Sequence, residues 1–281
     1  MTTRITTATD IKVRLSELCT AFKLSTLSQQ LGAGLAAAGH DEALALVLEY
    51  FETEAADRRE RRVDRLRRAS RLPPGKTLDS LDIGRLPRPL AAKLKALTSG
   101  EFLERADNVL CFGLPGVGKT HAAAALGNAL VDRGHAVLFT STFKLVQELL
   151  IAKRELRLNN ALRALDAFEL LILDDIGYVQ QDKDEVDVLF TLMAERYERR
   201  SMLITSNLVF SEWNKVFKDP MTTAAAIDRV VHHSVILEFA EVKTYRGEAA
   251  EKRRAGKGKG TPTAQTSPAL RITHERERAT D

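Results

Sequence analysis

One octapeptide constrains this chain of 281 residues more than any other feature, because it fits the phosphate-binding pattern G-x-x-x-x-G-K-[ST]. An apolar run at 108–112 precedes it, and an alanine-rich helix former at 121–130 follows. Such a strand, loop and helix would aim the helix N-terminus and backbone N–H groups at phosphates. A glycine turn with an incidental lysine is the alternative, and these flanks argue against it. The residues expected to bind the nucleotide are Gly113, Leu114, Pro115, Gly116, Val117, Gly118, Lys119, Thr120 and His121.

Two carboxylates follow a second apolar run, 170–173, later in the chain. We expect Asp174 to hold a magnesium ion together with the hydroxyl of Thr120, and Asp175 to act as a general base toward the attacking water. The alternative is a buried strand followed by an ordinary acidic turn. After a phosphate-binding loop, the catalytic interpretation is favoured.

Two further residues are candidates for catalysis. Asn207 follows a predicted strand and would contact the γ-phosphate or the lytic water, although asparagine is also common in turns. Arg229 lies on a predicted helix, from which it could reach a neighbouring subunit's phosphate, or simply pair with a nearby acid. His232 and His233 lack an acidic or cysteine partner at ligand spacing, so the sequence predicts no metal site there.

Alternating strands and helices predict an α/β fold with a parallel sheet between helices. The strands are expected at 108–112, 136–140, 170–173, 202–205 and 235–237, and helices at 143–153, 186–199 and 222–231. Residues 10–72 show only helical periodicity, which predicts two helices separated at Gly32, Gly34 and Gly39. We therefore expect a small all-α domain at 1–75, the nucleotide-binding domain at 76–247 and a basic, disordered tail at 248–281.

Positive charge is concentrated in one part of the chain, although the net charge is only +4. The stretch from Arg58 to Arg71 contains eight arginines but only Glu60 and Asp64 as acids. A solvated charged helix is the usual origin of such a run, but this imbalance favours contacts with the DNA backbone. The expected contacts are Arg58, Arg59, Arg61, Arg62, Arg65, Arg67 and Arg68.

The two cysteines, Cys19 and Cys111, fall in a predicted helix and a predicted buried strand, so no disulfide is expected. No apolar run is long enough to span a bilayer, and the first residues are too polar for a signal peptide. The expected location is the cytoplasm.

Taken together, these motifs resemble the IstB-like ATPases of bacterial insertion sequences, relatives of DnaC-type helicase loaders within the AAA+ class. The resemblance covers about residues 10 to 247. It is carried by the arginine-rich helix end and by 76–82, 108–121, 171–178, 204–207 and 211–213. It implies a transposition helper that binds ATP and Mg²⁺, forms homo-oligomers on duplex DNA and assists the element's separate transposase. It also implies a sensor role for Asn207, an arginine finger at Arg229, and slow, DNA-stimulated hydrolysis.

The resemblance has two departures. No lid helix with a clear sensor arginine follows the last predicted strand, although Tyr245-Arg246 stands where the family often has a similar pair. The tail after Gly247 extends beyond the part that the resemblance covers. A replicative helicase loader remains the main alternative function, and a small-molecule kinase the second, although no substrate lid is visible. No further set of spaced carboxylates predicts a nuclease centre in this chain.

Overall fold

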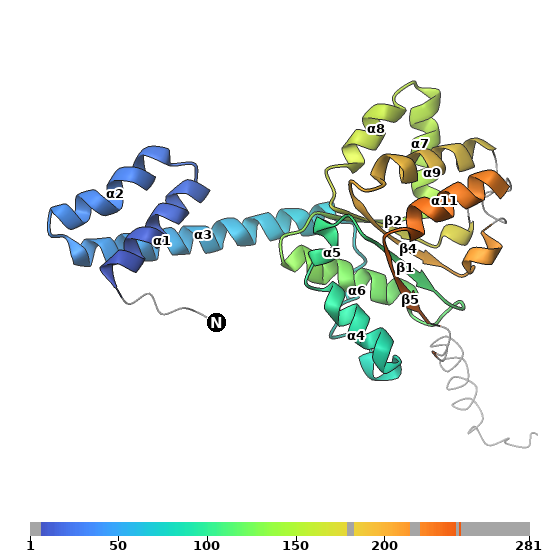
Figure 1. Ribbon diagram of the computed structural model, residues 1–281, viewed down its shortest axis with the longest axis horizontal. Helices are drawn as coiled ribbons and strands as arrows, with labels where there is room; N and C mark the ends of the chain where they lie inside the picture. The colour runs from blue at the N-terminus through green and yellow to red at the C-terminus, as the bar shows by residue number, and fades with distance from the viewer. Residues whose placement is uncertain (1–6, 179–182, 214–219, 240–241, 243–281) are drawn as a thin grey trace, which may run out of the picture. The chain divides into compact units, whose positions relative to one another are not determined.

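The computed structural model describes residues 7–178, 183–213, 220–239 and 242 (Figure 1). The predicted basic tail at 248–281 and the pair Tyr245-Arg246 lie outside the described residues. The division into domains at residues 75 and 247 stays a prediction.

The centre of the fold is a sheet of five parallel strands in the order β2-β3-β4-β1-β5. The strands are β1 (Asn108–Phe112), β2 (Val137–Ser141), β3 (Leu170–Asp174), β4 (Ser201–Ser206) and β5 (Ser234–Glu238). Each lies within one residue of its predicted position, and the α/β prediction is confirmed. Since parallel strands need crossover connections, helices cover both faces of the sheet.

Successive residues of each strand face opposite sides of the sheet, where they pack into two separate hydrophobic cores. Leu110 and Phe112 of β1 pack with α7 (Thr142–Arg154), α8 (Leu158–Leu165), α9 (Lys183–Arg196) and α11 (Pro220–Val231). Val109 and Cys111 face the other side, with α4 (Arg88–Leu97), α5 (Glu101–Glu104) and α6 (Lys119–Asp132). Because both faces of the sheet are buried, the strand sequences are continuous apolar runs and do not alternate with polar residues. The helices at 143–153, 186–199 and 222–231 match α7, α9 and α11, whereas α8 is not among the predicted elements.

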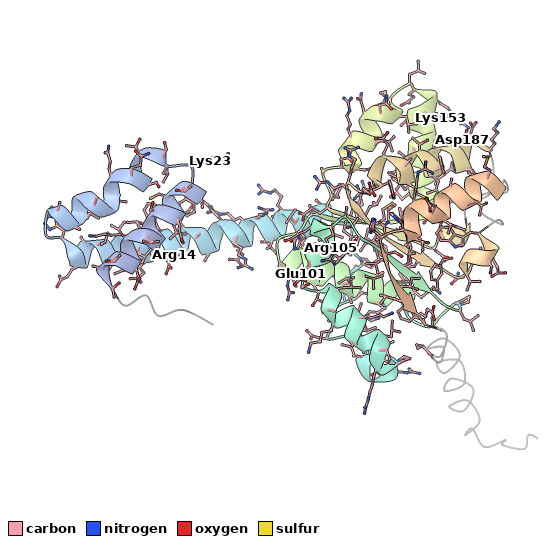
Figure 2. The ribbon with its side chains drawn as sticks, in the orientation of Figure 1. Arg14, Lys23, Glu101, Arg105, Lys153 and Asp187 are labelled. Atoms are coloured by element: carbon pink, nitrogen blue, oxygen red, sulfur yellow. The ribbon has the colours of Figure 1, made fainter. Side chains whose placement is uncertain are left out.

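A surface ion-pair cluster accompanies the packing of α7 on α9. Lys153 Nζ lies 2.8 Å from Asp184 Oδ1 and 3.6 Å from Asp187 Oδ2, and Figure 2 shows Lys153 and Asp187 together on these helices. Exposed pairs of this kind contribute little, about 0–1 kcal/mol, so the apolar seam beneath supplies most of the stability.

Residues 7–70, as the structure describes them, form three helices and not two: α1 (Ala8–Ala21), α2 (Ser25–Ala37) and α3 (Asp41–Ala69). The prediction of a single first helix is wrong, because the chain turns at Lys23, whose φ is +61°. Gly32 and Gly34 do not break a helix but lie inside α2. A Cβ on Gly32 would stand 3.4 Å from Lys12 Cγ, so glycine allows α2 to approach α1 closely. Gly39, with φ +72°, does precede α3.

The last turns of α3 join the second of the two cores. Val63, Leu66 and Leu72 pack against it, and the Phe139 N–H donates a 2.7 Å hydrogen bond to the Ser70 carbonyl. The arginine-rich helix end is therefore continuous with the packing of the nucleotide-binding domain. Both cysteines are free and buried. Among the described residues no helix is long and apolar enough to cross a membrane.

Candidate nucleotide site

The predicted nucleotide residues meet at one edge of the sheet. The glycine-rich loop follows β1, Asn207 follows β4, and Asp174 and Asp175 stand at the end of β3. In the sheet β4 lies between β1 and β3, so its carboxyl end separates the loop from the carboxylates. Ligands of parallel sheets bind at this edge.

The glycine-rich loop has the backbone that the pattern requires. Gly113, Gly116 and Gly118 have φ values of +154°, +84° and +101°, which residues with a Cβ rarely adopt. A Cβ on Gly113 would also stand 2.7 Å from Phe239 Cβ. Val117 packs into the core, whereas Leu114 and Pro115 are exposed. Helix α6 begins directly at Lys119, so its N-terminus faces the loop.

Lys119 is buried, with a relative exposure of 6%. Its Nζ donates hydrogen bonds to the carbonyls of Gly113 and Leu114, at 2.7 and 2.9 Å, and to Oδ1 of Asn207 at 2.6 Å. An ammonium has three donor positions, and these contacts direct them toward the loop and β4. The charge of Lys119 therefore stands where phosphate oxygens would be received.

Asp174 is the point at which three elements meet. Its Oδ1 accepts hydrogen bonds from Thr120 Oγ1 at 2.9 Å and from Thr205 Oγ1 at 2.7 Å. Its backbone carbonyl accepts one from Thr142 Oγ1 at 3.1 Å. Hydroxyl and carboxylate oxygens are the hard ligands that Mg²⁺ takes, so Thr120 and Asp174 fit a magnesium site. Sequence reasoning missed Thr205 and Thr142, although each closes or follows a predicted strand.

Asp175 adopts a left-handed backbone, with φ +64°, which is uncommon for a residue with a side chain. Its N–H donates to Thr205 Oγ1 at 2.8 Å, and its Oδ1 accepts a 3.1 Å hydrogen bond from Asn207 Nδ2. These contacts hold the carboxylate beside Asn207. The two residues predicted to act on the lytic water are thus brought together.

His121 is bonded to a segment far away in the sequence. Its Nε2 lies 3.0 Å from Ser80 Oγ, within the segment 76–82 that carries part of the resemblance. Burial lowers the pKa of His121 below its ordinary value, and the nearby Lys76 charge acts in the same direction. His121 is therefore neutral at pH 7 and adds no positive charge for phosphates.

Arg229 is not joined to this cluster by any contact among the described residues. It donates to the Ala225 carbonyl at 3.1 Å, and its guanidinium lies 4.7 Å from the centre of the Phe190 ring of α9. Arg229 is in the last turn of α11, which leads to the amino end of β5. The arrangement leaves its own nucleotide site without an arginine from α11.

The matching family model, IstB-like ATP binding protein, covers residues 8–253. The chain belongs to this family. It is 47% identical over 227 residues to an insertion sequence ATP-binding protein of Sinorhizobium fredii, a match that covers 80% of this chain and 76% of the relative. It is 39% identical to the ATP-binding protein of insertion sequence IS21 from Pseudomonas aeruginosa, with coverage of 73% and 77%.

The fold of this IstB-like chain is found in solved AAA+ structures. DnaA from Aquifex aeolicus, bound to AMPPCP, superposes with a TM-score of 0.53 and 18% identity. The superposition covers 66% of this chain and 57% of DnaA. At this identity the likeness concerns the fold alone, and it agrees with the predicted AAA+ architecture.

The end of α3 in this IstB-like protein carries all seven arginines predicted to contact DNA, and all are exposed. Three of them have acidic partners. Arg58 and Arg61 pair with Glu54 at 2.6 and 3.3 Å, and Arg67 pairs with Asp132. Their charge is partly neutralised within the protein.

The other four arginines have no acidic partner within the part of the chain that the structure describes. Arg62 and Arg68 donate to backbone carbonyls, at 3.2 and 3.3 Å. Because residues three apart are neighbours on a helix, the four form one ridge, which winds around α3 and does not lie along a single face. This unpaired ridge consists of Arg59, Arg62, Arg65 and Arg68.

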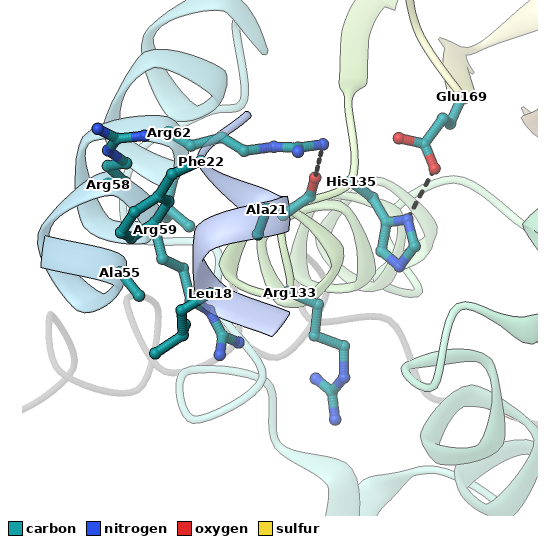
Figure 3. Close-up of a pocket in the computed structure, with 12 residues that line it drawn as sticks. Leu18, Ala21, Phe22, Ala55, Arg58, Arg59, Arg62, Arg133, His135 and Glu169 are labelled. Atoms are coloured by element: carbon teal, nitrogen blue, oxygen red, sulfur yellow. Dashed lines mark hydrogen bonds and ion pairs between the residues drawn. The ribbon is translucent and has the colours of Figure 1, made fainter. Parts of the chain in front are cut away.

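A basic cavity of about 570 Å³ lies beside the ridge (Figure 3). One acid is in its lining: Glu169, which lies 2.8 Å from His135 Nδ1. Burial raises the pKa of Glu169, but His135 and the Ala136 N–H outweigh that effect and keep it below its ordinary value. Four guanidinium groups face one partnered carboxylate there, so the lining carries an excess of positive charge even though Arg58 pairs with Glu54. They belong to Arg58, Arg59, Arg62 and Arg133.

Proposed function

We propose that this chain is an ATP-dependent, DNA-binding helper of transposition, which oligomerises on duplex DNA and directs a separate transposase. The observation that supports this most is the chain of hydrogen bonds from Lys119 through Asn207 to Asp175 at the sheet edge. It joins Lys119 and Asn207, which would contact the γ-phosphate, to Asp175, which would act on the attacking water. The names of the relatives supply the insertion-sequence context.

In this proposal the chain hydrolyses ATP to ADP and phosphate. Lys119 receives the β and γ phosphates, Thr120 and Asp174 hold Mg²⁺, and Asp175 polarises a water that Asn207 helps to position. The metal ion supplies charge neutralisation for the transferred phosphoryl group. Aspartate is shorter than the glutamate found in many AAA+ proteins, so we expect hydrolysis to be slow. We also expect DNA to stimulate it.

Assembly would place Arg229 of one subunit against the phosphates of the next. A guanidinium binds phosphate through a fixed fork, which stabilises the transition-state charge. If the site is completed by a neighbour, ATP binding and assembly favour each other by linkage. Lys119→Ala should therefore abolish ATP-dependent oligomerisation on DNA, as measured by sedimentation with and without ATP. Undiminished assembly of this variant would contradict the proposed coupling between ATP binding and oligomerisation.

DNA binding is assigned to the unpaired ridge in residues 1–75. Each phosphate contact with duplex DNA lowers the slope of log K against log salt by about 0.9. Arg59→Ala combined with Arg65→Ala should make the slope less steep by about 1.8. The matched control, Arg58→Ala with Arg67→Ala, removes arginines that already have acidic partners and should change it less. Equal effects of the two pairs would show that the ridge is not the contact surface.

A replicative helicase loader would share this core, so duplex binding is the discriminating measurement. A helper of transposition binds duplex DNA by itself, with steep weakening as salt is added. A loader needs a helicase as its partner. Weak duplex binding that is insensitive to salt, together with tight helicase binding, would favour the loader.

A further inference from the structure

A cluster of potential metal ligands lies away from the nucleotide site. It consists of Glu198, between α9 and β4, and His232 and His233, between α11 and β5. One ligand atom from each residue lies within 4.8 Å of the other two. Both connections lead into the amino ends of parallel strands, whereas Asp174 and Asn207 stand at the carboxyl ends. The cluster is therefore at the opposite edge of the sheet.

The side chains of the cluster already contact one another. His233 Nε2 lies 3.8 Å from Glu198 Oε1, and the two imidazole rings have centroids 4.2 Å apart. His232 Nδ1 lies 3.0 Å from the hydroxyl of Tyr197. In zinc sites a second hydrogen bond of this kind orients the imidazole ligand. The tautomer with Nδ1–H donating to the phenol oxygen leaves Nε2 with a free lone pair.

Backbone hydrogen bonds fix the two histidines. The Asn108 N–H donates to the His233 carbonyl at 2.7 Å, and the His232 N–H donates to the Asp228 carbonyl at 3.0 Å. Asn108 is itself buried. Its side-chain amide donates a hydrogen bond to the Val230 carbonyl and accepts one from the Met202 N–H. The backbone positions of the two histidines are thus set by hydrogen bonds to β1 and α11.

The chemistry of these donors selects a class of metal. Two imidazole nitrogens and one carboxylate oxygen form a set that Zn²⁺ takes with a fourth position open to water. Mg²⁺ prefers oxygen ligands, so it would favour Thr120 and Asp174. Neighbouring arginines do not oppose a cation strongly. Arg199 pairs with Asp166 at 3.0 Å and Glu195 at 3.3 Å, and the positive charge of Arg229, which acts on Tyr197, is opposed there by the negative charge of Asp228.

We propose that Glu198, His232 and His233 bind a divalent transition-metal ion of the zinc class. All three side chains are exposed, so the ion reaches them directly from solvent. Tetrahedral zinc with bonds of about 2.0–2.1 Å needs ligand atoms about 3.4 Å apart, so small rotations of the side chains complete the site. The bound ion ties the α9–β4 connection to the α11–β5 connection.

The experiment uses the full chain without an affinity tag, free of nucleotide and Mg²⁺, titrated with ZnCl₂ alone. We expect one Zn²⁺ per chain and a higher melting temperature with zinc, because an ion that binds the folded state stabilises it. The triple variant Glu198→Gln, His232→Ala, His233→Ala should lose both effects. Tyr197→Phe should weaken zinc binding about 10-fold. His40→Ala, which removes an exposed histidine elsewhere, should bind zinc as the wild type does.

A second measurement does not depend on variants that fold. X-ray absorption of the wild-type zinc complex should show nitrogen and oxygen ligands at about 2.0–2.1 Å with imidazole scattering. Asp174→Asn should leave zinc binding unchanged, because it alters the other edge of the sheet. The proposal is overturned if the wild type binds no zinc, if the triple variant binds it equally, or if imidazole scattering is absent.

Discussion

The ammonium of Lys119 donates a 2.6 Å hydrogen bond to Oδ1 of Asn207, so the phosphate-binding loop and the end of β4 are directly connected. The same amide reaches Asp175 through Nδ2 at 3.1 Å. Asn207 therefore stands between the lysine that would meet the γ-phosphate and the carboxylate that would act on water. Loss of either side chain would leave one end of the Asn207 amide without this hydrogen bond.

The first prediction concerns that amide. Asn207→Ala should lower the kcat of ATP hydrolysis about 100-fold, because Asp175 loses a hydrogen bond that holds its carboxylate in place, and small misplacements cost this much. ATP binding should weaken much less, since Lys119 keeps its loop contacts. Steady-state kinetics and nucleotide titration measure the two effects. Asn159→Ala, on the exposed surface of α8, is the control and should leave both unchanged.

The second prediction separates a shared site from a site within one chain. Lys119→Ala cannot receive phosphate, and Arg229→Ala cannot complete a neighbour's site, so each variant alone should be inactive. Mixing them should restore part of the DNA-stimulated ATPase rate, because a Lys119→Ala subunit still offers its arginine to an intact loop. ATPase activity measured across mixing ratios tests this. No recovery at any ratio would contradict the role of Arg229 between subunits.

The third prediction concerns Thr205, whose hydroxyl joins both carboxylate residues. Thr205→Val keeps the volume but removes the bond that orients Asp174, so the apparent affinity for Mg²⁺ should fall about 10-fold, as for other supporting contacts around metals. The Mg²⁺ dependence of ATP hydrolysis measures it. Thr191→Val, which removes a hydroxyl bonded only within α9 among the described residues, is a matched control.

The fourth prediction is a pH dependence of stability. Burial lowers the pKa of His121 in the folded chain, so the unfolded chain takes up this proton at a higher pH. The free energy of unfolding should decrease as the pH falls through about 6.5, the ordinary histidine value, toward the lower pKa of the folded state. Urea unfolding at pH 7.5 and 5.5 measures this. His121→Gln should lose less stability between these pH values, and a wild-type loss in that variant would contradict the assignment.

The fifth prediction compares two glycines inside helices. Gly34→Ala in α2 should stabilise the protein by about 0.8–1 kcal/mol, because a Cβ there meets nothing within 4 Å. Gly127→Ala in α6 should instead destabilise it by about 1 kcal/mol, because overpacking outweighs the same helix gain. Its Cβ would stand 2.8 Å from Leu72 Cδ2 and 2.9 Å from Ile172 Cδ1. Chemical denaturation of both variants would show opposite signs.

The strands were predictable because their signals are local, and so was the position of the predicted nucleotide residues at one edge of the sheet. The apolar run from Asn108 to Phe112, followed by glycines, predicts a buried strand and a phosphate-binding loop. The parallel topology then brings Asp174 and Asn207 to the same edge of the sheet. The turn at Lys23 was not predictable, since a left-handed lysine carries no composition signal. Gly32 was misread for a related reason: it serves close packing of α2 on α1, which only the tertiary structure reveals.

The histidine pair shows the same limit at a site. Sequence spacing gave His232 and His233 no acidic partner, because Glu198 belongs to a different connection and comes near only through the sheet. The role of Thr205 was not visible in the sequence, since its partners Asp174 and Asp175 stand at the end of another strand, β3. Contacts across neighbouring strands are set by sheet order, which one sequence does not state.

The contact between Gly113 and Phe239 has an evolutionary consequence. Any side chain at 113 would collide with Phe239 before it could disturb a nucleotide, and the Phe239 N–H is held to the Phe112 carbonyl at 2.7 Å. The first glycine of the loop is thus required by packing as well as by phosphate chemistry. The colliding atoms are the Cβ and backbone of Phe239, which every residue except glycine has, so copies of this gene that lose selection for ATP binding should still keep glycine at 113 whichever side chain occupies 239.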